Sequence, residues 1–134
     1  MAQINIFNPP QLGKPLGQYS QITRVKATEL IFIAGQVGGR TDGSIPDTFE
    51  AQCELAFANT LTALQACGAG WGNVVQFTTY LVNSRDIPKL RKFRAVHFPK
   101  FFPDGQYPPN TLLVVNRLAG EDMLIEIAAI AALA

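Results

Sequence analysis

Short runs of apolar and β-branched residues, separated by segments rich in glycine and proline, predict a series of β-strands. These runs are Gln21–Val25, Leu30–Gln36, Val74–Val82, Thr111–Val115 and Met123–Ala131. The second run is almost entirely apolar, so we expect it to be a central strand. Three prolines and two glycines among the first 20 residues predict an irregular arm there.

Two longer segments have the 3.6-residue periodicity of helices. The first follows Asp47, which with Glu50 resembles a capping box, and should end before Gly68, where a left-handed cap is easily formed. The second should begin near Asp86 and end or kink before Pro99, which lacks an amide proton. We expect its buried stripe to consist of Leu90, Phe93 and His97.

The order ββαβαββ predicts an α+β fold in one domain, residues 1–134, with two helices packed on one face of a mixed sheet. The last strand, however, is apolar at both odd and even positions from Leu124 to Ala131, so it presents apolar residues to both faces of the sheet. The chain has no third helix to cover the second sheet face. We therefore expect a homo-oligomer in which sheets pack against one another.

Composition narrows the class of protein further. The 134 residues are 48% hydrophobic, which excludes disorder, and the formal net charge is only +1, so we expect no nucleic-acid partner. No apolar stretch is long enough to cross a bilayer and no leader pattern opens the chain, so we expect no membrane association. The ~1.5 Å rise per helical residue puts Cys53 and Cys67 ~21 Å apart, which predicts reduced core thiols and a cytoplasmic location.

Several common kinds of functional site are not supported by the residues. The glycine-rich run Gly68–Gly72 precedes a strand instead of opening a helix, so it does not predict a phosphate loop. His97 is the only histidine and has no second ligand at metal-binding spacing, so we expect no metal. No nucleophile elbow surrounds a serine, so the residues do not predict a Ser-His-Asp site.

Glu126 is the most informative single residue, because it is a lone carboxylate in an otherwise apolar strand. Such a group is costly to bury unless it is paired or protonated. In an interface cleft it could act as a general acid or base that positions a water molecule. The alternative is a structural salt bridge to Arg117 or Arg24, and the residues alone favour neither interpretation.

Several segments, in order, resemble the RidA (YjgF) family. Gly17–Gln21 is similar to the family's Gly-Pro-Tyr-Ser-Gln segment, and Ile31–Gln36 resembles its strand ending Ser-Gly-Gln. The segments Tyr107–Asn110 and Ile125–Ala131 are similar to the "YPAR" and "IEIEAIA" segments near its end. The resemblance extends over about residues 15 to 131 in matching order and spacing, apart from a few extra residues in the second helix.

This resemblance implies a chorismate-mutase-like subunit assembled as a homotrimer, with an inner barrel of sheets and small-molecule sites in the clefts between subunits. It also implies hydrolysis of reactive enamines or imines to a keto acid and ammonia, without metal or organic cofactor. In the family an arginine after "YPA" would grip the substrate carboxylate, and the strand glutamate would hold the attacking water.

The chain departs from the family pattern at the arginine position, which is Asn110, and a neutral amide cannot supply a charged fork. Ala34 stands where the family has serine, and Leu112 where it has cysteine. The catalytic candidates that remain are Glu126 and Tyr19, and the substrate-binding candidates are Asn110, Gly35, Arg91, Leu112 and Ala34. We expect Arg91, on the second helix, either to restore a cation to the cleft or to be an ordinary solvated arginine.

Three functions fit these residues. The first is a hydrolase or deaminase of imines, enamines or related small metabolites, with a preference altered by Asn110 toward a less acidic substrate. The second is a trimer that binds a small metabolite in the same cleft without turnover, as a sensor or buffer. The third, ribonuclease activity, is disfavoured by the near-neutral charge and the lack of a basic patch.

Overall fold

The protein is described by a computed structural model covering residues 2–134, which confirms the expected α+β class. One sheet has the strand order β3-β6-β4-β5, and a two-stranded sheet pairs β1 with β2. The strands are β1 (Gln3–Phe7), β2 (Ile22–Lys26), β3 (Glu29–Val37), β4 (Val74–Leu81), β5 (Asn110–Val114) and β6 (Ile125–Leu133). The helices are α1 (Phe49–Ala66) and α2 (Ile87–Phe101), with short 3-10 turns at Trp71–Asn73 and Ser84–Asp86.

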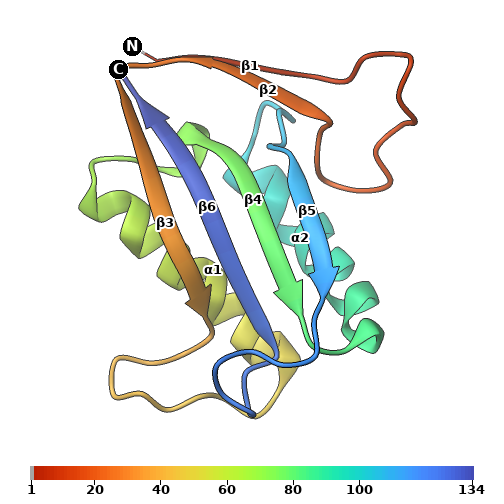
Figure 1. Ribbon diagram of the computed structural model, residues 1–134, viewed down its shortest axis with the longest axis vertical. Helices are drawn as coiled ribbons and strands as arrows, with labels where there is room; N and C mark the ends of the chain where they lie inside the picture. The colour runs from red at the N-terminus through yellow and green to blue at the C-terminus, as the bar shows by residue number, and fades with distance from the viewer. Residues whose placement is uncertain (1) are drawn as a thin grey trace.

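The four-stranded sheet is mixed. β4 and β5 run parallel, whereas β6 is antiparallel to both of its neighbours, β3 and β4. Both helices lie behind this sheet in Figure 1, and the small β1–β2 sheet lies across its upper end. One face of the sheet is therefore covered by helices and the other is not.

Two strand expectations are wrong. Part of the supposedly irregular arm, Gln3–Phe7, forms β1, because Ile4 and Ile6 alternate with polar residues before the first proline. β3 lies at an edge of the sheet in the single chain and is not central. Its apolar residues point to both faces of the sheet. Ile31 and Ile33 are buried on one face, whereas the side chains that alternate with them are exposed on the other.

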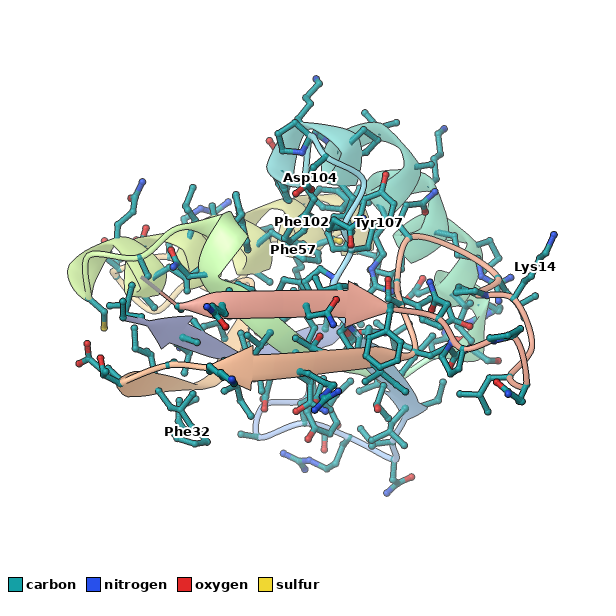
Figure 2. All side chains as sticks on the ribbon, turned by 90° about the horizontal axis from the view of Figure 1, so that it is seen from above. Lys14, Phe32, Phe57, Phe102, Asp104 and Tyr107 are labelled. Atoms are coloured by element: carbon teal, nitrogen blue, oxygen red, sulfur yellow. The ribbon has the colours of Figure 1, made fainter. Side chains whose placement is uncertain are left out.

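Aromatic side chains fill the space between the sheet and the helices. Phe57 from α1 stacks on Phe93 with ring centroids 4.8 Å apart, and it meets Phe77 and Phe98 edge to face. Figure 2 shows Phe57, Phe102 and Tyr107 on the helix side of the sheet and Phe32 on the opposite side. This core fixes α2 against β4 and β5, where the candidate site lies.

The ends of the helices differ from expectation in detail. Thr48, and not Asp47, caps α1, because its hydroxyl accepts from the backbone N–H of Ala51 at 3.2 Å. Gly68 has φ +73° and ends the helix as predicted. α2 continues through Pro99 to Phe101, so the proline neither ends nor breaks it.

The buried stripe of α2 also differs from the predicted one. It consists of Leu90, Arg94 and Phe98, one residue in every fourth position. Phe93 and His97 are only half-buried beside it. The polar member of the stripe, Arg94, is 6% exposed and was not expected inside.

The uncovered side of the sheet is here termed the open face. Its outermost apolar side chains are Phe32, Leu30 and Leu113, which are 71%, 53% and 43% exposed. The half-buried residues of β6 that alternate with its buried ones share this face, and they are Glu126, Ala128 and Ile130. On β3 and β6 this uncovered face is thus apolar apart from Glu126, whereas β4 contributes the polar residues Gln76, Thr78 and Tyr80.

The cysteines were both expected in the core, and this is wrong for one of them. Cys53 is buried and Cys67 is exposed at the end of α1, and both thiols are free. Burial raises the pKa of Cys53 to about 12. Within residues 2–134, neither helix has the length and apolar character needed to span a membrane.

Candidate functional site

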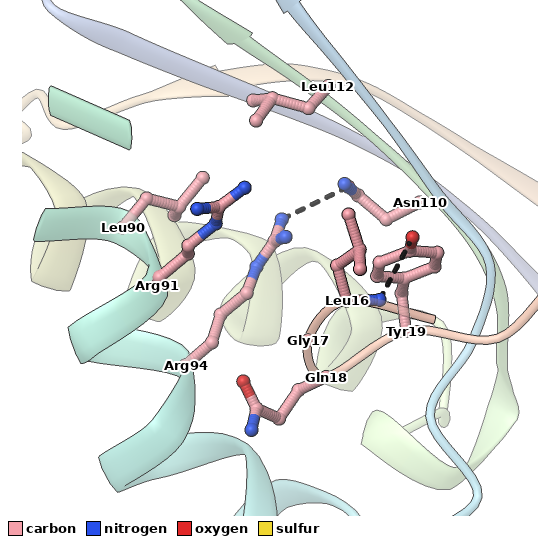
Figure 3. A pocket seen from close by; sticks show the side chains of 9 residues that line it. All are labelled: Leu16, Gly17, Gln18, Tyr19, Leu90, Arg91, Arg94, Asn110 and Leu112. Carbon is pink, nitrogen blue, oxygen red and sulfur yellow. Dashed lines mark hydrogen bonds between the residues drawn. The ribbon is translucent and has the colours of Figure 1, made fainter. Parts of the chain in front are cut away.

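A pocket of about 240 Å³ lies where α2 faces the start of β5, and the N-terminal arm closes its outer side (Figure 3). Three of its side chains are leucines, two are arginines, and none of the lining residues is acidic. The lining residues are Leu16, Gly17, Gln18, Tyr19, Leu90, Arg91, Arg94, Asn110 and Leu112. Its volume suits a small metabolite, because pockets for drug-sized ligands start at roughly 300 Å³.

A hydrogen-bonded triad joins two residues of the pocket lining, Arg94 and Asn110, to the buried Thr79. Nη2 of Arg94 donates to Thr79 Oγ1 at 2.9 Å and to Asn110 Oδ1 at 3.1 Å. The Thr79 hydroxyl in turn donates to Asn110 Oδ1 at 2.7 Å. In the parallel pairing of β4 and β5, Asn110 lies opposite Phe77, so Thr79 is its diagonal neighbour two residues further along β4.

The triad fixes the orientation of the Asn110 amide. Both of its partners donate to Oδ1, so the carbonyl oxygen must point toward them. The Nδ2 group is then left as a donor for a further acceptor. Asn110 is therefore held at one atom and free at the other.

The electrostatic environment of Arg94 is unusual. The described chain forms no ion pair with it, and its Nε is buried without a hydrogen-bond partner. Its Cζ lies 5.4 Å from the centre of the Phe98 ring, which provides a weak cation–π contact. Desolvation by burial lowers the pKa of Arg94 to about 10, so the side chain still carries its charge at neutral pH.

The arm positions Tyr19 at the mouth of the pocket. Its hydroxyl accepts a hydrogen bond from the backbone N–H of Leu16 at 3.2 Å, which closes a tight loop in the arm. The arm is attached to the start of β5 by a bridge between Ser20 and Pro109. The same attachment places Tyr19 beside Asn110.

Glu126 lies elsewhere, on the open face, together with Gly35 and Ala34 of β3. The Glu126 side chain packs directly on Gly35, where an added Cβ would come within 2.1 Å of the carboxylate. A side chain at position 35 is thus incompatible with this placement of Glu126. The sheet separates this pair from the pocket, because β4 and β5 turn Thr79 and Leu112 toward the helices.

The structural alternative for Glu126 has no support in residues 2–134. Arg117 is paired with Glu121, and no ion pair joins Glu126 to Arg24 or Arg117.

His97 packs on Phe93 with ring centroids 4.3 Å apart. In the described part of the chain, His, Cys, Asp and Glu side chains nowhere gather in threes that could hold a metal ion.

The structure thus divides the predicted residues into two groups. Tyr19, Asn110, Arg91 and Leu112 surround the pocket, whereas Glu126, Gly35 and Ala34 lie on the open face. Arg91 lines the pocket as an exposed residue of α2.

Sequence reasoning missed Arg94. The signal was its spacing of four from both Leu90 and Phe98, which puts one charge inside an apolar helical stripe.

The fold and the pocket define a small α+β domain with a ligand-sized site at one edge of a half-covered sheet. The chain belongs to the RidA (YjgF) family, because residues 11–133 match the protein family described as Endoribonuclease L-PSP.

Individual relatives agree with this assignment. The chain is 30% identical to the RutC family protein slr0709 of Synechocystis, over 97% of each chain. A Yersinia pestis protein described as of unknown function in the Rid family has a similar structure, with a TM-score of 0.86 and 25% identity over 97% of this chain and 98% of that one. Escherichia coli TdcF, whose structure contains bound serine, matches with a TM-score of 0.69 and 25% identity over 97% of this chain and 99% of that one.

Proposed function

We propose that the protein is a homotrimeric hydrolase of imines or enamines of small metabolites, which acts without a cofactor at clefts between its copies. The observation that carries this proposal is the division of the site. One face offers a carboxylate, Glu126, set over Gly35, and the other offers a pocket with Tyr19 and Asn110. Two copies of the chain, each contributing one half, would complete a cleft.

The apolar open face supports this arrangement of copies. Leu30 and Phe32 would leave water if the sheets of neighbouring chains packed together, and burial of such side chains is worth roughly 1.5–3 kcal/mol each. Closed symmetry is the usual way in which identical chains cover such a face. Glu126 would then lie within a partly dry cleft and not in open solvent.

In this cleft Glu126 would act on water. A carboxylate is a suitable general base for delivering water to the electrophilic carbon of an imine, and it can return the proton to the departing nitrogen. The result is a carbonyl compound and an amine or ammonia. Tyr19, at the mouth of the pocket, would cover the bound substrate.

Asn110 would shift the substrate preference relative to family members that carry an arginine at the corresponding position. The bound serine in Escherichia coli TdcF supports a small, polar metabolite as the kind of ligand. The net charge of +1 offers little attraction for RNA, so we propose a small-molecule substrate.

One observation favours binding without turnover as a second candidate function. The pocket within a single chain is lined by two arginines and by no carboxylate. Such a lining holds a ligand but offers no base. If copies do not assemble so that Glu126 reaches the pocket, the protein binds a metabolite and does not convert it.

The test compares native protein with Glu126→Gln. An amino-acid oxidase generates a 2-imino acid, and its disappearance is followed with and without purified protein. We expect the native protein to accelerate the loss and Glu126→Gln to reduce the acceleration by about 10²–10⁴-fold, the usual contribution of a general base. The variant should keep the native molecular mass and thermal midpoint, since glutamine preserves the shape of the side chain.

Absence of acceleration by the native protein would reject hydrolysis of these imines. Native rates in a correctly assembled Glu126→Gln variant would reject the role of the carboxylate. Loss of assembly in the variant would assign Glu126 a structural role.

A further inference from the structure

We propose that Arg94 is the anion-recognising residue of the pocket, and that the ligand is a small monocarboxylate with a short apolar chain. This inference deepens the proposed function, since it names the substrate class of the same site. It also reverses the expectation that Asn110 selects a less acidic substrate. The cation comes from α2 instead of β5.

The first argument is that folding does not explain this buried charge. A buried arginine usually lies against a carboxylate, but the part of the chain that the structure describes provides none. Thr79 and Asn110 do not require Arg94, because the threonine hydroxyl already donates to the amide oxygen at 2.7 Å. The guanidinium is held in position by partners that are satisfied without it.

The second argument is that the donors of Arg94 are only partly used. Nη2 uses its two hydrogens on Thr79 and Asn110, and Nε is buried without a partner, whereas Nη1 makes no hydrogen bond within the described chain. Figure 3 shows the guanidinium extending from α2 into the pocket, between Arg91 and the arm. Beside it, the Nδ2 group of Asn110 is a further available donor, because both hydrogen bonds of this amide are at Oδ1.

These donors suit a planar oxyanion. With the triad intact, Nη1 of Arg94 can donate to one carboxylate oxygen, and the neighbouring Nδ2 of Asn110 can donate to the other. Held in place by the triad, Arg94 loses little freedom when the ligand binds. In a site shielded from water, this attraction is stronger than at an exposed arginine.

The rest of the pocket sets the size and polarity of the ligand. Leu16, Leu90 and Leu112 line it, so the part of the ligand beyond the anion meets apolar surface. A volume of about 240 Å³ limits that part to a few carbon atoms. These walls favour a short-chain organic acid over inorganic phosphate, which has no apolar part.

Binding is measured by titration calorimetry on the intact protein, with 2-oxobutanoate as the probe. This acid is the kind of product that imine hydrolysis would release, and 2-oxobutanamide is its neutral counterpart. We expect the acid to bind at least about tenfold more tightly than the amide and more tightly than inorganic phosphate. Arg94→Met should weaken binding of the acid by at least about tenfold.

Two variants complete the design. Asn110→Asp keeps the oxygen that joins the triad and adds a carboxylate next to Arg94, so we expect it to neutralise the site and weaken acid binding similarly. This near-isosteric change remains informative if Arg94→Met does not fold. Lys92→Met removes a charge from an exposed position of the same helix, outside the pocket, and should leave binding unchanged.

Three results with the native protein would overturn the proposal: equal binding of acid and amide, no binding of either, or binding of phosphate as tight as that of the acid. Unchanged acid binding in a folded Arg94→Met or Asn110→Asp variant would overturn it as well. Its failure is distinct from that of the proposed function. Binding of 2-oxobutanoate that depends on Arg94 but is accompanied by no imine hydrolysis would contradict the hydrolase alone. Hydrolysis that is indifferent to Arg94 would contradict this inference alone.

Discussion

At the scale of the residue, Arg94 is a buried charge for which the fold provides no opposite charge. Arg94 is only 6% exposed, so its guanidinium has lost most of its hydration, and no carboxylate of residues 2–134 pairs with it. Its lowered pKa, about 10, expresses the same imbalance. Because this value lies far above neutrality, the charged form and its full desolvation cost persist at pH 7.

We therefore predict that Arg94→Met stabilises the protein while it removes anion binding. Methionine fills much of the same volume beside Phe98, and Thr79 and Asn110 keep the hydrogen bond between them. Replacing a buried ion pair by apolar residues of similar size is neutral or stabilising by about 1–4 kcal/mol, and because Arg94 lacks an ionic partner to offset its desolvation, we expect a change of the same sign. Chemical denaturation at pH 7 measures the change. A loss of more than about 1 kcal/mol would show that Arg94 holds the fold together.

Individual residues were predictable where the sequence pattern itself was anomalous. Glu126 was visible as a charge inside an apolar strand, and Gly35 was visible as part of the motif beside it. Arg94 was not predicted because the buried stripe was assigned to Leu90, Phe93 and His97. The observed stripe lies one residue further along the helix, at Arg94 and Phe98. In an amphipathic helix with aromatic residues on two sides, spacing alone does not choose between these registers.

At the scale of the element, local sequence signals predicted where the helices and strands lie along the chain. They did not predict which strands are neighbours in the sheet. Gly68 ends α1 as expected, and β4 begins at the predicted residue. Sheet order was not predictable, since the edge position of β3 depends on long-range pairing with β6. An edge strand whose exposed side is covered by another chain needs apolar residues on both faces. The nine-residue β3 therefore has the sequence pattern of a central strand.

The end of α1 gives a prediction that concerns the backbone alone. Gly68 has φ +73°, and a Cβ added there would meet no atom within 4 Å. Gly68→Ala should thus cost about 1–2 kcal/mol of folding free energy, entirely from the left-handed conformation. Thermal or chemical denaturation measures it.

Gly70→Ala is the matched control for this substitution. Gly70 lies two residues further along, has equally open surroundings and φ −146°, which any residue can adopt. It should be neutral or slightly stabilising, because alanine restricts the unfolded chain. Equal effects at the two positions would contradict the role of the left-handed cap.

At the scale of the whole molecule, the open face connects fold and function. The helices bury one side of the sheet, and the alternate residues of β3 and β6 leave an apolar surface around Glu126. The pocket with Arg94 lies on the other side, near β5. A single chain keeps the carboxylate and the cation on opposite sides of the sheet, so joint action requires an assembly.

This separation predicts that assembly and turnover are lost together, whereas anion binding survives. Phe32, 71% exposed on the open face, is the most accessible contact for a neighbouring sheet. Phe32→Glu would place a charge in that interface, which is costly without a partner. Light scattering should then show a mass near the 14.6 kDa of one chain instead of three times this value, and imine hydrolysis should fall with it.

Val96→Glu provides the control, because Val96 is 52% exposed on α2, on the helix side of the sheet. It introduces the same charge and should change neither mass nor rate. Since Arg94, Thr79 and Asn110 come from one chain, the Phe32→Glu monomer should still bind 2-oxobutanoate. A monomer with native turnover would place the whole catalytic machinery in one subunit. A monomer that has also lost acid binding would show that the neighbouring copy shapes the anion site as well.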